Sequence, residues 1–264
     1  MADGSPVSEQ DTVRRLRAAG CVFAEDEARL LHEAAATTVR LDELVTARVA
    51  GEPLEHLLGW VEFGGRRMVI EAGVFVPRRR TEFLVEQAVG LAGAGDVVVD
   101  LCCGSGALGA ALAARVEGIE LHAADLDPAA VGCARRTIAA VGGVAYVGDL
   151  FEPLPPGLRG RVRVLMANVP YVPTSAIPLM PSEARDHEPR VALDGGSDGL
   201  QVMRRMVSDA RSWLAPGGSV LVEVSERQAP LVVALFADHR LVSRVARSQD
   251  YGATVVVGTR PVSL

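Results

Sequence analysis

Asn168 closes an apolar stretch and is followed at once by a stiff corner that contains an aromatic ring. Residues 161–167, RVRVLMA, are typical of a buried strand, and Pro170 and Tyr171 come soon after Asn168. A side-chain amide oxygen can accept an N–H bond from a small planar group, and an aromatic ring can pack on the flat face of that group. The corner therefore predicts a site for an amide or an exocyclic amino group. A strand-end turn without a ligand is the alternative.

A glycine-rich loop with an acidic residue before it is the second stretch that could do chemistry. Asp100 lies in the apolar run 96–101, and Gly104 and Gly106 follow before a predicted helix. Glycine lets the backbone turn sharply and leaves room for a ligand because it has no Cβ. The helix N-terminus adds unpaired N–H groups. The loop predicts a small-molecule site, against the alternative of a turn that holds nothing.

The acidic residues around this loop favour one of two cofactors that both contain adenosine. The loop fits the pattern G-x-G-x-x-G, and Asp125 lies about 20 positions further on, where it could bind a ribose diol. Asp100, however, precedes the glycines, where it would repel a pyrophosphate and attract the ammonium group of a methionine moiety. Asp149 and Asn168 end the next two apolar runs. The four positions favour S-adenosylmethionine over NAD.

Composition limits the classes of protein to which the chain can belong. It has 264 residues, 49% of them hydrophobic, and a net charge of −6, which fits one large domain or a main domain with an appendage. No block of Lys and Arg could follow a phosphate backbone, so direct binding of nucleic acid is not expected. The four cysteines lack the spacing of a metal site, so no metal is predicted. Without a signal pattern or a long apolar run, we expect a cytoplasmic protein with no membrane contact, and a monomer.

Apolar strands that alternate with helices predict an α/β fold for residues 81–264. The predicted strands are 96–101, 119–126, 144–150, 162–168, 218–225 and a terminal hairpin of 241–248 and 253–260. The predicted helices are 81–92, 107–115, 128–140, 198–214 and 227–237. Because most strands are apolar almost throughout, they should form a parallel sheet covered on both faces. We expect a mostly parallel, seven-stranded sheet.

The first 80 residues differ from this pattern. Apolar residues recur at helical spacings from residue 8 to about 58, so residues 1–59 are expected to form a small helical domain on the substrate side, too short for a core of its own. Residues 60–80 have β character on both sides of Gly64-Gly65, which predicts a hairpin linker. Residues 81–264 would form the cofactor-binding domain.

Together these motifs resemble those of HemK-type (PrmC-type) protein-(glutamine-N5) methyltransferases, which methylate the GGQ glutamine of peptide-chain release factors. The resemblance extends over most of the chain, through GEPLEHLLGWVEFGG, VPRRRTEFLVE, DLCCGSGALGAALA, ADLDPAAVGCA, GDLF, NVPY, EPRVALDGGSDGL and LAPGGSVLVEV. The glycine loop alone indicates only a methyltransferase, whereas the Asn-x-Pro-Tyr corner and residues 188–200 are more specific. The resemblance implies a Rossmann-like class I methyltransferase fold and S-adenosylmethionine as cofactor.

The resemblance also implies a role for individual residues. Asn168 would accept one amide N–H through its side-chain oxygen, and the main-chain carbonyl of Val169 would accept the other. The implied catalytic residues are Asn168, Val169, Pro170 and Tyr171. The implied cofactor contacts are Asp100, Leu101, Cys102, Cys103, Gly104, Gly106, Asp125, Leu126, Asp149, Leu150 and Asn168, with Asp125 at the ribose and Asp149 at the adenine.

Three departures from the family pattern lie close to these residues. Val169 stands where the family's Asn-Pro-Pro-Tyr corner has a proline, and Cys102-Cys103 replaces Gly-Thr. Residues 77–82, PRRRTE, carry two arginines where the family has a proline and an acid. The changes at 169 and 77–82 bear on the substrate more than on the reaction. The arginine run 78–80 is either a solvated charge run or a contact to substrate or RNA.

Two other functions remain open on the sequence. A DNA or RNA adenine-N6 methyltransferase could use the same corner, because an exocyclic amino group also presents two N–H bonds. The acidic balance and the lack of a basic target-recognition segment argue against it. The second is a non-catalytic methyltransferase-like module that binds a partner. The intact residues Asp100, Gly104, Gly106, Asp125 and Asn168 oppose it, and measured cofactor binding would discriminate.

Overall fold

Four helices open the computed structural model, which describes residues 8–262. They are α1 (Glu9–Ala18), α2 (Ala24–Ala34), α3 (Thr38–Val49) and α4 (Leu54–Leu58). Ser8 and Thr37 accept backbone N–H groups at the starts of α1 and α3, which satisfies donors that a helix leaves unpaired. The expectation that this part has no core of its own is wrong. The apolar faces of α1 to α3 meet in a separate buried cluster: Leu16, Ala24, Ala28, Leu31, Leu41, Leu44 and Val45.

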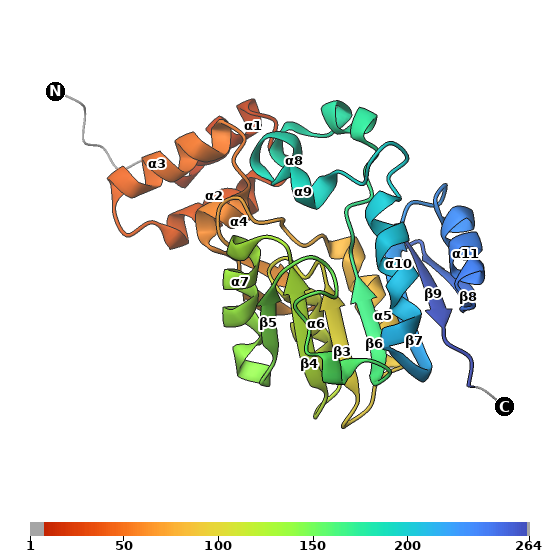
Figure 1. The fold of residues 1–264 in the computed structure, drawn as a ribbon. Coiled ribbons are helices and arrows are strands. Elements are labelled where there is room, and N and C mark those ends of the chain that lie inside the picture. The colour runs from red at the N-terminus through yellow and green to blue at the C-terminus, as the bar shows by residue number, and fades with distance from the viewer. Residues whose placement is uncertain (1–7, 263–264) are drawn as a thin grey trace.

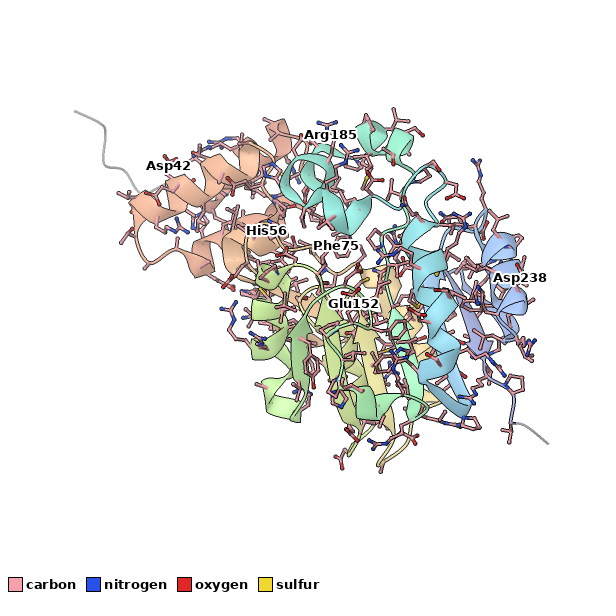
Figure 2. The ribbon with its side chains drawn as sticks, in the orientation of Figure 1. Asp42, His56, Phe75, Glu152, Arg185 and Asp238 are labelled. Atoms are coloured by element: carbon pink, nitrogen blue, oxygen red, sulfur yellow. The ribbon has the colours of Figure 1, made fainter. Side chains whose placement is uncertain are left out.

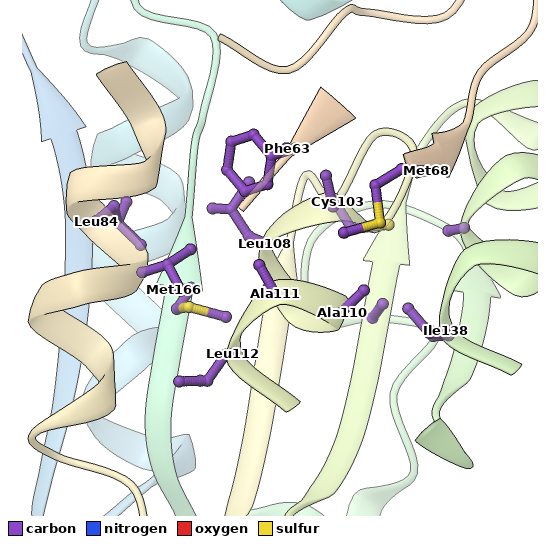
Figure 3. Packing of buried hydrophobic residues seen from close by; sticks show 14 of the residues in the cluster. Phe63, Met68, Leu84, Cys103, Leu108, Ala110, Ala111, Leu112, Ile138 and Met166 are labelled. Carbon is purple, nitrogen blue, oxygen red and sulfur yellow. The ribbon is translucent and has the colours of Figure 1, made fainter. Parts of the chain in front are cut away.

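The predicted hairpin follows directly. β1 (Trp60–Phe63) pairs antiparallel with β2 (Arg66–Val69), and Gly64 and Gly65 both have positive φ, as a tight two-residue turn requires. Phe63 and Met68 point into the main apolar cluster, where Figure 3 shows them beside α6 (Ala107–Ala113). The chain then passes through the 3-10 turn η1 (Arg79–Thr81) into α5 (Glu82–Val89).

The main sheet has seven strands, six of which were placed within three residues of their observed starts. They are β3 (Val97–Leu101), β4 (Glu120–Asp125), β5 (Val144–Val147), β6 (Val162–Ala167), β7 (Leu214–Val224), β8 (Val242–Ser248) and β9 (Ala253–Thr259). Their order is β5-β4-β3-β6-β7-β9-β8, parallel except for β9, which runs antiparallel to β7 and β8. The mostly parallel sheet with an antiparallel final hairpin is therefore confirmed. β7 begins earlier than predicted, at Leu214, because Pro216-Gly217-Gly218 lies inside the strand.

Helices cover both faces of this sheet, as Figure 1 shows. One face carries α5, α6 and α7 (Pro128–Ile138), and the other carries α10 (Gln201–Trp213) and α11 (Ala229–Asp238). Successive strand residues alternate between the two cores: Val98 belongs to the first, and Val97 and Val99 to the second. Burial on both sides explains why the strands are apolar almost throughout. Two short 3-10 turns, η2 (Ala139–Val141) and η3 (Pro156–Leu158), complete this part.

A segment that the sequence did not predict as helical lies over the carboxyl ends of the strands. This cap segment, residues 174–193, contains η4 (Thr174–Leu179), α8 (Ser182–His187) and α9 (Arg190–Leu193). Figure 1 shows it beside the N-terminal helices, and Arg48 of α3 contacts Glu183 of α8 with an N–O distance of 3.2 Å. The prolines that divide the segment hid its short helices from periodicity.

Within residues 8–262, none of the helices combines the length and the apolar character needed to cross a membrane.

Candidate active site

Five adjacent strands present an acidic or amide side chain at or just beyond their carboxyl ends. In sheet order from β5 to β7 these residues are Asp149, Asp125, Asp100, Asn168 and Glu223. The sequence identified the first four, and the strand order brings them to one edge, where the chain reverses its direction of travel between β3 and β6. Sequence reasoning missed Glu223. Its signal was a single charged residue inside the apolar run 218–225.

A pocket at this edge has two halves. The cofactor half is lined by Cys102, Gly104, Asp125, Leu126, Asp149 and Leu150. The acceptor half is lined by Asn168, Val169, Pro170 and Tyr171. Parts of the cap segment and of α10 close the wall, together with Phe75, which Figure 2 shows between the sheet edge and α9. The four further predicted residues lie in the surrounding structure and do not line the pocket: Asp100, Leu101, Cys103 and Gly106.

The three glycines of the loop have different tasks. Gly104 has φ +54°, and a Cβ built there would meet no atom within 4 Å, so its open side faces space that a ligand can use. At Gly106 a Cβ would lie 3.0 Å from Ala134 Cα, so this glycine lets α6 approach α7. The N–H of Gly109 donates to Asp100 Oδ2 at 2.9 Å. Only Gly104 is free of protein neighbours on the side where a ligand would lie.

Asp125 at the end of β4 is held by the backbone. Oδ2 accepts from the Gly104 N–H at 2.8 Å, and Oδ1 from the Asp127 N–H at 2.9 Å. Each carboxylate oxygen has two acceptor sites, so both can still accept a hydroxyl. Burial raises the pKa of Asp125, while these two N–H bonds act in the opposite direction. The residue is therefore fixed in position and retains the capacity to bind a ribose diol.

Asp149 lies at the other end of the cofactor half and has a cation beside it. Arg205 of α10 donates to Asp149 Oδ2 at 2.6 Å, and both side chains line the pocket. Leu126 is 52% exposed on the pocket wall, although it is apolar, and Leu150 adopts a positive φ of 50°. An exposed leucine beside a fixed carboxylate suits a flat heterocycle with an amino group. Sequence reasoning did not identify Arg205.

Asp100 is buried beneath the pocket. Its Oδ1 has no hydrogen-bond partner among the described residues, and burial raises the pKa of this carboxyl to about 8. Leu101 is fully buried in the core on the α10 side of the sheet. A contact between Asp100 and a cofactor ammonium group stays a prediction, supported by the unpaired oxygen.

The two adjacent cysteines point in different directions. Cys102 lines the pocket and has a φ of 52°, in the left-handed region that a side chain disfavours. Cys103 is buried in the apolar cluster that also contains Met68 and Leu108, as Figure 3 shows. Burial raises the pKa of both thiols, which makes them weak nucleophiles. A cofactor contact by the Cys103 side chain is not supported, because that side chain packs in the core.

The acceptor corner leaves one hydrogen-bond acceptor unused. Asn168 Oδ1 is buried and has no partner among the described residues. Val169 is 1% exposed, and Pro170 is buried as well. Tyr171 is anchored through its main chain, since Gln228 Nε2 donates to its carbonyl oxygen at 3.0 Å. An unpaired buried amide oxygen is costly in a folded protein, so this corner is suited to a ligand that brings an N–H group.

The arginine run divides into three different environments. Arg78 donates to both carboxylate oxygens of Glu188, at 2.6 Å each, and Arg80 donates to Glu223 Oε1 at 2.8 Å. Both carboxylates are buried. Arg78 is half-buried, Arg79 is exposed, and the Arg80 side chain is 47% exposed although it contacts a buried partner. Of the two alternatives for this stretch, a fully solvated charge run does not describe Arg78 or Arg80, because each has a buried carboxylate partner; contact with substrate or RNA stays a prediction.

The cofactor half fits S-adenosylmethionine. The side of Gly104 without a Cβ is open and Asp125 has acceptor capacity left. Near the glycine loop, Asp100 Oδ1 has no hydrogen-bond partner in the part of the chain that the structure describes. An acidic residue buried before the glycines suits an ammonium group better than a pyrophosphate.

Comparison with known proteins gives the family. Residues 67–173 match the methyltransferase small domain. The chain is 36% identical over 219 residues to a release factor glutamine methyltransferase of Geobacter sulfurreducens, covering 82% of this chain and 76% of that one. It is 38% identical over 202 residues to the Streptomyces coelicolor release factor glutamine methyltransferase, covering 75% and 72%. A methyltransferase structure from Pyrococcus furiosus, 13% identical with a TM-score of 0.54, covers 86% of this chain and 100% of that one and shares the fold. The chain belongs to the release factor glutamine methyltransferase family.

Proposed function

We propose that this chain transfers a methyl group from S-adenosylmethionine to the side-chain amide nitrogen of a protein glutamine, the GGQ glutamine of a peptide-chain release factor. Family membership supports this reaction. The observation that carries it is the buried Oδ1 of Asn168, a pocket residue, which has no hydrogen-bond partner within residues 8–262. A glutamine amide would supply the missing N–H.

The chain's own residues orient the acceptor. A carboxamide nitrogen is a poor nucleophile because its lone pair is delocalised into the carbonyl. Asn168 Oδ1 accepts one N–H and the Val169 carbonyl the other, which directs the nitrogen toward the cofactor half. Tyr171 packs on the flat amide, and the buried corner excludes water. When bound, S-adenosylmethionine supplies the electrophilic methyl group. Orientation of this kind contributes several kcal/mol to a transfer.

The N-terminal helices would serve substrate binding. Arg48 of α3 bonds Glu27 of α2 at 2.7 Å and Glu183 of the cap segment at 3.2 Å, so these helices are tied to the segment that walls the acceptor half. A release factor that reaches the pocket would pass between surfaces of both. This role in substrate binding requires that residues 1–59 act as the substrate-side domain.

The test is methylation of a defined acceptor. The purified chain is incubated with labelled S-adenosylmethionine and a release factor that either keeps its GGQ glutamine or has alanine there. Label is expected only in the glutamine-containing protein. Adenine-containing DNA and RNA form the third arm, and label in these instead of the protein would contradict the proposal.

A further inference from the structure

Three side chains that are far apart in the sequence meet beside the acceptor half. Arg80 Nε donates to Glu223 Oε1 at 2.8 Å, across 143 residues, and Arg80 Nη2 donates to the Tyr171 hydroxyl at 2.5 Å, across 91 residues. The Tyr171 hydroxyl in turn donates to Glu223 Oε1 at 3.2 Å. The three form a closed hydrogen-bonded ring in which one guanidinium contacts both partners.

Glu223 needs a cation at this place. Its side chain is 3% exposed, and its Oε2 has no partner among the residues that the structure describes. A buried carboxylate without a charged partner is strongly destabilising. Arg80 is the cation that contacts it within residues 8–262, but a simple ion pair would need only one donor. The second donor goes to Tyr171.

The bond from Arg80 fixes the hydroxyl end of the Tyr171 side chain, which contacts to the Tyr171 main chain cannot fix. Gln228 holds the main-chain carbonyl of Tyr171 at 3.0 Å, while Arg80 and Glu223 hold the phenol oxygen. Burial, with Glu223 as the next cause, raises the pKa of Tyr171 to about 12, so the hydroxyl keeps its proton and remains a donor. Tyr171 and Arg80 both line the pocket. The position of the ring and of its long axis beside the Asn168 acceptor is therefore fixed at both ends.

We propose that Arg80 is a positioning residue for methyl transfer: its guanidinium fork holds the Tyr171 phenol against Glu223 and so fixes the position of the aromatic ring against which the acceptor amide packs. This inference rests on the proposed function of the acceptor half. It also gives a role to an arginine that stands where the family pattern has an acid. A guanidinium suits this task because its donors have a fixed, planar arrangement that an ammonium group does not reproduce.

Arg80→Lys separates positioning from charge neutralisation. The ammonium group can still pair with Glu223, so a purely structural arginine would leave catalysis unchanged. Positioning predicts a kcat about 10-fold lower on the release factor substrate, with KM for that substrate within about two-fold, since the lost interaction orients the acceptor in the transition state. Cofactor affinity and thermal stability are measured for the same variant. Arg115→Lys, an exposed arginine beyond the end of α6 that is remote from the pocket, is the matched control.

A double-mutant cycle with Tyr171→Phe tests whether Arg80 acts through the phenol. Without the hydroxyl, Arg80→Lys should cause no further loss of kcat beyond about two-fold. An unchanged kcat in Arg80→Lys alone, or an equal loss in both backgrounds, would overturn the proposal.

A spectroscopic measurement keeps this test independent of the substrate. The chain has three tyrosines, so labelling with ¹³Cζ-tyrosine gives three resonances, and Tyr171→Phe identifies one of them. Arg80→Lys should shift that resonance, and Arg115→Lys should not. If the wild-type chain fails to methylate the release factor, the proposed function is wrong. The spectrum still tests whether Arg80 contacts the Tyr171 hydroxyl. An unmoved Tyr171 resonance would overturn the inference.

Discussion

The two halves of the pocket differ in how far protein groups already satisfy their polar atoms. In the cofactor half, Asp125 accepts two backbone N–H bonds and Asp149 is paired with Arg205. In the acceptor half, Asn168 Oδ1 is buried without a partner among the described residues. An unsatisfied buried acceptor costs about 1–3 kcal/mol. The cofactor half is thus built before its ligand arrives, whereas the ligand completes the acceptor half.

Asp100 is the exception on the cofactor side. Its Oδ2 is bonded to the Gly109 N–H, but its Oδ1 is as unpaired as that of Asn168. Both halves therefore contain a buried acceptor without a partner among the described residues, but in the cofactor half more of the carboxylate oxygens are already hydrogen-bonded. This difference predicts that substitutions in the two halves separate binding from catalysis.

Asn168→Ala should have the largest effect. Methylation should fall by about 100- to 1,000-fold, because the acceptor nitrogen loses the group that orients it, as when one oriented hydrogen bond is removed from an active site. Cofactor affinity should stay within a few-fold. Single-turnover rates on a GGQ-containing substrate and calorimetry with S-adenosylmethionine check both. Val169→Pro is the control, since proline also offers a main-chain carbonyl, and it should keep activity. The opposite pattern would mean that the corner is only a turn.

Asp125→Ala should act on the other half. The ribose hydroxyls lose a charged acceptor, whose bonds are worth about 1.5–3 kcal/mol, so the Kd for S-adenosylmethionine should rise about 10- to 150-fold. Saturating cofactor should restore much of the methylation rate. Calorimetry with S-adenosylmethionine and with NAD is the measurement. Unchanged affinity together with comparable NAD binding would contradict our assignment of this half.

Asp100 should make folding stability depend on pH. In the folded chain its pKa is about 8, whereas an unfolded aspartate titrates at about 4. The folded state therefore binds more protons between these values. This stabilising contribution is complete below pH about 4 and is lost as the pH rises towards 8, with a slope of up to about 1.4 kcal/mol per pH unit.

Asp100→Asn should remove that slope, because its amide oxygen can still accept from Gly109 and cannot ionise. Urea unfolding of both proteins at several pH values from 5 to 8 measures the difference. Parallel curves for the two proteins would show that Asp100 ionises normally in the fold.

Cys102→Gly should have the smallest effect. Cys102 has a φ of 52°, which strains a residue that has a side chain but not glycine. Loss of this strain is partly offset by the entropy that glycine loses on folding, so the free energy of unfolding should rise by about 0.5–1 kcal/mol. Cys103→Gly is the matched change at the adjacent position, and it should destabilise the chain because it leaves a cavity in the core. Thermal unfolding of both variants checks the pair. A drop in stability for Cys102→Gly would show that the thiol contributes more than its backbone strain costs.

Local pattern was enough to predict most of the fold. The strands β3 to β6 were located because buried strands are continuous apolar runs. The helices between them were located because their apolar residues recur at the helical spacing of three to four residues. The cap segment was missed because its helices are four to six residues long and separated by prolines. The independent core of α1 to α3 was missed because periodicity shows that each helix has an apolar face, but not that the three helices bury these faces against one another.

The sequence by itself determined which strands end in polar residues, because Asp100, Asp125 and Asn168 stand at the ends of apolar runs that can be recognised without the structure. Only the tertiary structure decided what lies beside them. It placed β3 beside β6 and turned the Cys103 side chain into the core. It also brought together Arg80, Tyr171 and Glu223, which lie up to 143 positions apart in the sequence. Periodicity reports which face of an element is buried, but not which element covers it, because that depends on how the whole chain packs.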